Sequence, residues 1–86
     1  MKILGKQLVA ARGLLGWTQR QLAAAADVHL DTIVTWEHGE HEPRDSTIRR
    51  VVAVIEDRGV EFLNGGAPGV RFKPKPDAAQ NDSAGK

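Results

Sequence analysis

Apolar side chains recur every three or four residues in four stretches of the chain. The first stretch runs from Leu4 to Leu15, and the last begins at Asp45 or Ser46 and continues to about Arg58. Two shorter stretches lie between them, from Thr18 to Ala26 and from His29 to Gly39. Because this spacing places apolar residues on one face of an α-helix, the sequence predicts four helices.

The positions that repeat on one face of each helix define a predicted hydrophobic core. Its members are Leu8, Leu22, Ile33, Trp36, Ile48, Val52 and Ile55. Trp17 follows the first helix, where its large ring is expected to cover this small core. The 86 residues of the chain suffice for one domain near the lower size limit for unaided folding.

After Gly59 the pattern changes from helical spacing to alternation. Val60–Leu63 and Val70–Lys73 are predicted to form two short strands, joined by a glycine-rich turn. Because an isolated hairpin is marginally stable in water, we expect it to pack on the helices or on a second copy of the chain in a homodimer. Residues 74–86 contain no apolar residue larger than Ala and are predicted to be a disordered polar tail, which leaves a domain of residues 1–73.

The two short central helices have the signals of a helix-turn-helix. Thr18 and Gln21 have the spacing of a capping box, in which each side chain bonds the other residue's backbone amide. Leu22 and the alanines 23, 25 and 26 keep this helix slim, so that another helix can approach it closely. Asp27 tolerates the left-handed backbone of a sharp turn, and a second helix then starts near His29 and ends at Gly39. The pattern predicts two short helices joined by a tight turn.

These residues resemble a known family, the Cro and lambda-repressor-like (XRE) helix-turn-helix proteins. The resemblance rests on Gln19, Leu22-Ala23, Ala26-Asp27-Val28, Thr32-Ile33, Trp36-Glu37 and Gly39. It extends over about residues 4 to 63 and implies a mainly α fold, a four- to five-helix lambda-repressor-like DNA-binding domain, here with a short C-terminal β-hairpin. The chain departs from the family pattern at Asp27, where Gly is usual, and at His29, where Ser or Thr is usual.

The resemblance also implies roles for individual residues. In such proteins the second helix of the motif enters the major groove of a double-stranded DNA operator. The matching contact positions here are His29, Leu30, Asp31 and Thr35, with Gln19 on a phosphate and Arg44 near the minor groove. Arg12 and Glu37 match a pair that bridges the first and third helices of the family, and they are expected to be scaffold. Transcription regulation is the function that follows.

Several other classes of protein are disfavoured. The chain has no Cys, no signal-peptide pattern and no apolar run near the roughly 20 residues that cross a bilayer, so a cytoplasmic protein without a membrane segment is expected. His38 and His41 lie on either side of the helix-ending Gly39, a poor arrangement for a metal site. No nucleophile motif is present, and we expect neither enzymatic activity, nor a cofactor, nor a bound metal.

Charge leaves two hypotheses open. The chain has a net charge of +1, but residues 27–45 contain six acidic residues and a single Arg, a net charge of −5. In the first hypothesis the protein binds DNA with basic residues outside the recognition helix: Lys2, Lys6, Arg12, Arg20, Arg44, Arg49 and Arg50. In the second it is an antiactivator that sequesters a transcriptional activator through an acidic, partly apolar surface. That surface would comprise His29, Leu30, Val34, His38 and Glu40.

Overall fold

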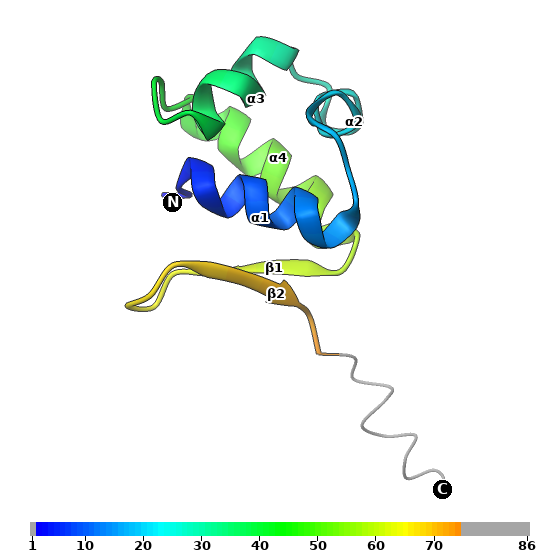
Figure 1. Ribbon diagram of the computed structural model, residues 1–86, viewed down its shortest axis with the longest axis vertical. Coiled ribbons are helices and arrows are strands. Elements are labelled where there is room, and N and C mark those ends of the chain that lie inside the picture. Colours follow the sequence, from blue (N-terminus) through cyan, green and yellow to red (C-terminus); the bar gives the residue numbers. More distant parts are fainter. Residues whose placement is uncertain (1, 75–86) are drawn as a thin grey trace, which may run out of the picture.

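The computed structural model describes residues 2–74. It contains four helices followed by a two-stranded antiparallel sheet (Figure 1). The elements are α1 (Gly5–Leu15), α2 (Gln19–Ala26), α3 (Leu30–Glu37), α4 (Asp45–Asp57), β1 (Val60–Leu63) and β2 (Gly69–Phe72). The prediction of a mainly α domain with a C-terminal hairpin is confirmed. No helix in the described residues is long and apolar enough to cross a membrane.

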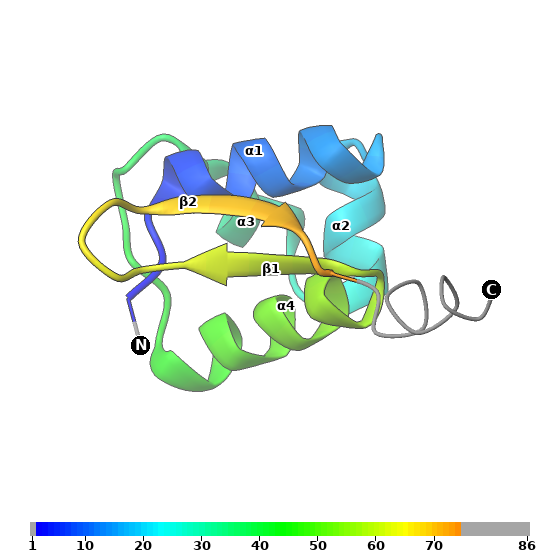
Figure 2. The same ribbon diagram turned by 90° about the horizontal axis from the view of Figure 1, so that it is seen from below.

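The hairpin lies beneath the helices as a second layer. Figure 1 shows the two strands below α1 and α4, and Figure 2, seen from below, shows β2 nearer to α1 and β1 nearer to α4. The register pairs Val60 with Phe72 and Phe62 with Val70. Val60 is fully buried, and Phe62 and Val70 pack against the core. The hairpin therefore covers the lower side of the helical domain and leaves α3 on the opposite side.

The core is formed by side chains from all four helices. The residues predicted for it from sequence spacing are all at most 5% exposed: Leu8, Leu22, Ile33, Trp36, Ile48, Val52 and Ile55. Ile3 and Val51 are buried with them, and Trp17 packs partly buried against the cluster. Because Ile33 and Trp36 point inward, the opposite side of α3 faces solvent. The candidate site lies on this solvent-facing side.

Two contacts hold the chain N-terminus and the hairpin to the helices. Trp36 Nε1 donates to the Ile3 carbonyl oxygen at 3.0 Å, and a side chain at Gly5 would collide with the backbone at Trp36. The buried Gln7 amide lies 3.1–3.2 Å from three acceptors, the carbonyl oxygens of Leu63 and Gly69 and the side chain of Asn64. The hairpin turn is thereby fastened to α1.

Several boundaries differ from the prediction. Helix α4 begins at Asp45 with Arg44 in the capping position, so neither Asp45 nor Ser46 caps it. Asp45 instead lies in the first turn, where the positive end of the helix dipole stabilises its carboxylate. The second strand is shifted one residue towards the N-terminus, and Ala25 is exposed while Ala23 and Ala26 are buried. The predicted tail falls almost wholly outside the described residues.

Candidate nucleic-acid interface

Helices α2 and α3 pack against each other across a three-residue turn. The Thr18 hydroxyl accepts from the Gln21 amide at 3.0 Å, and the Gln21 side chain accepts from the Thr18 amide at 2.8 Å, which completes the capping box. Asp27 ends α2 in the left-handed conformation, with φ of 57°. The buried faces of Ala23 and Ala26 carry only methyl groups, so α3 can lie close to α2. The sequence thus forms a helix-turn-helix.

A hydrogen-bonded ion pair fixes α3 to α1. Arg12 Nε lies 2.7 Å from Glu37 Oε2 and Arg12 Nη2 lies 2.9 Å from Glu37 Oε1, a bidentate geometry. The side chains are 18% and 3% exposed, respectively. Arg12 also donates to the Trp17 carbonyl oxygen at 2.9 Å. The hydrogen bond to Glu37 and the charge of that carboxylate raise the pKa of Arg12, against a lowering effect of burial. The pair therefore joins two helices and the connection after α1.

Gln19 belongs to the same network. Its side-chain amide donates to Glu37 Oε1 at 2.9 Å, and the residue is half-buried. The sequence predicted a donor available to phosphate at this position, but one of its two amide hydrogens is engaged with Glu37. Gln19 therefore takes part in the network around Glu37, and its second amide hydrogen is left for the predicted phosphate contact.

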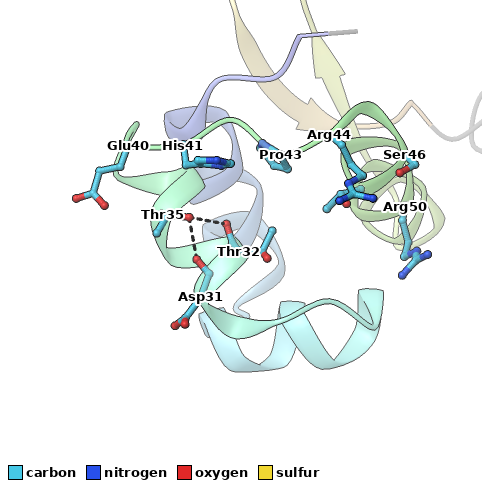
Figure 3. A pocket seen from close by; sticks show the side chains of 10 residues that line it. Asp31, Thr32, Thr35, Glu40, His41, Pro43, Arg44, Ser46 and Arg50 are labelled. Carbon is cyan, nitrogen blue, oxygen red and sulfur yellow. Dashed lines mark hydrogen bonds between the residues drawn. The ribbon is translucent and has the colours of Figure 1, made fainter.

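An open cleft of about 740 Å³ lies between α3, the loop after it and the start of α4. Its lining residues are Asp31, Thr32, Thr35, Glu40, His41, Pro43, Arg44, Ser46, Thr47 and Arg50. Figure 3 shows Asp31, Thr35 and Glu40 on the α3 side and Arg44 and Arg50 on the α4 side. The cleft thus has an acidic wall and a basic wall.

The basic wall keeps donors free for a ligand. The Arg44 guanidinium makes no hydrogen bond or ion pair with any residue that the structure describes. Arg50 Nη1 donates to the Asp27 carbonyl oxygen at 3.1 Å and so connects α4 to the end of α2, with its other donors left over. Both side chains are exposed. Two guanidinium groups therefore face the space in front of α3.

The structure separates the contact residues predicted on α3 into two groups. His29, Asp31 and His38 are exposed, whereas Leu30, Val34 and Thr35 are half-buried. Leu30 packs partly buried against the core cluster and Val34 is half-buried, so both offer a partner less apolar surface than fully exposed side chains would. Leu30 lies at the boundary between the buried and exposed faces of the helix, where spacing alone does not determine which side it joins.

Ion pairs with residues outside the segment offset much of the negative charge of residues 27–45. Lys2 Nζ lies 3.4 Å from Glu42 Oε1, and Arg49 Nε lies 2.8 Å from Asp45 Oδ2. Together with the Arg12–Glu37 pair, these contacts provide a basic partner for three of the six carboxylates. They also show that Lys2, Arg12 and Arg49 are paired within the protein and are not free basic contacts.

Five further cleft residues were not among the predicted contact residues: Thr32, His41, Pro43, Ser46 and Thr47. A signal for two of them exists, since Ser46, Thr47 and Arg50 have the spacing of one polar face on α4. Within residues 2–74, no group of three or more His, Asp or Glu side chains is arranged to hold a metal ion.

Comparison with known proteins agrees with this geometry. No curated protein matches the chain. The family model described as Helix-turn-helix, HTH_3, matches residues 8–56, which include all of α2 and α3 and most of α1 and α4. This match covers more than half of the chain, and the protein belongs to the XRE-type helix-turn-helix family of DNA-binding regulatory domains.

Proposed function

We propose that the protein is a cytoplasmic transcription regulator that binds a double-stranded operator with α3 in the major groove. The proposal is supported by the cleft in front of α3, whose α4 wall carries the exposed Arg50 and an Arg44 guanidinium that is unpaired among residues 2–74. Guanidinium groups on the wall opposite the recognition helix suit contacts with the DNA phosphates. Neutralisation of these phosphates supplies most of the sequence-independent affinity. The role requires neither catalysis nor a cofactor.

His29 and Asp31 are the residues best placed for base contacts. Both are exposed in the first turn of α3 or directly before it, the part of a recognition helix that reaches base edges. Thr35 lies one turn later and lines the cleft. Leu30 and Val34 support the position of α3 from its half-buried side and have a smaller part in binding.

Two copies are proposed to associate through the edge of β2. Lys73 N donates to the Gly59 carbonyl oxygen, and in an antiparallel ladder with this register the backbone groups of Val70 and Phe72 face away from β1. Phe72 is 58% exposed on the same strand. An open edge beside an exposed aromatic ring is a surface for strand pairing. A Phe72→Glu substitution should shift a dimeric mass to a monomeric one in light scattering, and a monomeric wild-type protein would contradict the proposal.

A protein-binding antiactivator is the second candidate. It is supported by Asp31 and Glu40, which have no Lys or Arg partner among the described residues. Since Leu30 packs on the core, the surface for a protein partner would be mainly acidic, with His29, His38 and half-buried Val34 around it. A Glu40→Lys variant that loses a co-purifying protein partner while retaining its fold would favour this function.

Fluorescence anisotropy with a random-sequence duplex distinguishes the two functions. A DNA regulator should bind the duplex at about 50 mM salt, and the affinity should fall steeply as salt rises because counterions are released. Arg44→Ala should reduce that slope by about one unit, the effect of one lost phosphate contact. Absence of binding at low salt would overturn the DNA-binding proposal.

A further inference from the structure

We infer that the α3 wall of the cleft selects base edges that carry an exocyclic amino group, cytosine first and adenine second. The inference rests on the DNA-binding function proposed above and adds the chemical class of base that it reads. Asp31 is exposed in the first turn of α3 and lines the cleft. An ionised carboxylate only accepts hydrogen bonds, so it must face a donor on the DNA.

Thr35 does not add a donor to this wall. Its hydroxyl donates to the Asp31 carbonyl oxygen at 2.9 Å and also lies 3.5 Å from the Thr32 carbonyl oxygen (Figure 3). A hydroxyl has one hydrogen, and here that hydrogen is directed to the backbone of the preceding turn. A ligand in the cleft therefore meets the methyl group and the oxygen lone pairs of Thr35.

The Glu40 carboxylate on this side of the cleft is also a hydrogen-bond acceptor. Glu40 lines the cleft, and His38 Nδ1 lies 4.0 Å from its carboxylate, beyond hydrogen-bond distance. The guanidinium donors of the cleft, on Arg44 and Arg50, are on the opposite wall. Asp31, Thr35 and Glu40 thus present acceptors and a methyl group on this side of the cleft, and the Thr32 hydroxyl beside them can donate or accept.

The major-groove edges of the four bases differ in how they meet such a wall. Guanine presents two acceptors, N7 and O6, and thymine presents the O4 acceptor beside its methyl group, so neither base offers a donor to a carboxylate. Cytosine presents the N4 amino donor, and adenine presents the N6 amino donor beside the N7 acceptor. Asp31 therefore favours cytosine, tolerates adenine and disfavours guanine.

The test uses base analogues in a duplex selected by the protein from a random-sequence pool. Single cytosines are replaced by the 2-pyrimidinone nucleotide and single adenines by the purine nucleotide, each of which lacks only the exocyclic amino group. At the position that Asp31 reads, this replacement should weaken binding of the wild-type protein by about tenfold. The same replacement should have no effect on Asp31→Ala, which has lost the acceptor.

Glu42→Ala is the matched control, because Glu42 is a carboxylate of the same segment that pairs with Lys2 and does not line the cleft. It should keep the full response to the analogue. Asp31→Asn should move the preference at that position towards adenine, since Asn pairs with N6 and N7 together.

The outcomes separate this inference from the function on which it rests. A pool from which the protein enriches no duplex overturns the DNA-binding proposal, and the inference with it. An enriched duplex at which no amino-group deletion depends on Asp31, or one in which Asp31→Ala retains the wild-type preference, overturns the inference alone. Far-ultraviolet circular dichroism of each variant checks that this exposed substitution leaves the fold intact.

Discussion

On the side of α3 that faces α1, the Glu37 carboxylate is 3% exposed and bonded to Arg12 and Gln19. On the side that faces the cleft, the Asp31 carboxylate is exposed and no described residue provides it with a partner. Both residues add one negative charge to the same short helix. The role of a charged side chain in this domain therefore depends on whether neighbouring groups already bond to it. The buried carboxylate positions α3, and the exposed one is available to a ligand.

Removing the buried carboxylate should have the largest effect. Glu37→Ala leaves the partly buried Arg12 guanidinium without its carboxylate, and we expect a loss of about 2–3 kcal/mol in the free energy of unfolding. Urea denaturation followed by circular dichroism measures it. Glu40→Ala, at an exposed carboxylate, should change stability by no more than about 0.5 kcal/mol. Similar losses in the two variants would show that the two kinds of carboxylate do not differ.

On the cleft side the expected effect is on binding and not on stability. Arg44→Ala should weaken binding to every duplex by about tenfold, because one phosphate contact is lost whatever the base sequence. Arg49→Ala is the control, since Arg49 already pairs with Asp45 one helical turn away. Anisotropy titrations at two salt concentrations measure both. A sequence-dependent loss in Arg44→Ala would instead indicate that this residue contacts bases.

The pH dependence of the buried pair follows from the raised pKa of Arg12. A cation whose pKa is higher in the folded state contributes its full stabilisation below the unfolded-state pKa and loses it only as pH rises through the folded-state pKa. The difference in unfolding free energy between the wild type and Glu37→Ala should therefore stay constant from about pH 7 to about pH 10, well below the range in which arginine titrates. A decline of the difference within that interval would contradict the assignment of the pair as the stabilising element.

The smallest effect is expected at Thr35. Thr35→Val removes a hydroxyl that is already bonded to the backbone and keeps the methyl group, so duplex affinity should change by less than about threefold. Thr35→Asp places another carboxylate on the same wall and should weaken binding more. A loss of tenfold or more in Thr35→Val would mean that the hydroxyl turns towards the DNA in the complex.

The sequence predicts the helices and the turn between α2 and α3 well, because the signals for these elements are local. Thr18 and Gln21 are three residues apart, Ile33 and Trp36 have the spacing of one buried face, and Asp27 suits the left-handed turn that it occupies. These features depend on neighbours along the chain. The family resemblance, whose helix-turn-helix model matches residues 8–56, pairs Arg12 with Glu37 across 25 residues, which spacing alone would not do.

What the sequence does not predict depends on distant partners. Gln7 is a polar residue inside the core, and its acceptors lie 56 to 62 residues further along the chain. Lys2 offsets the charge of Glu42 across 40 residues, so a charge count over residues 27–45 overstates the repulsion of DNA. Leu30 is a different case, because the helical period does not determine the side of a residue at the edge of the buried face, and the structure packs it against the core.

NMR can establish whether the solvent-facing side of α3 and the start of α4 dock on DNA. Amide chemical shifts of the ¹⁵N-labelled protein are followed while the selected duplex is added. We predict that the largest changes fall between His29 and Arg50, at Asp31, Thr35 and Arg44, with little change in β1 and β2. Changes concentrated in the hairpin or on the outer face of α1, with α3 unaffected, would show that α3 does not dock on DNA.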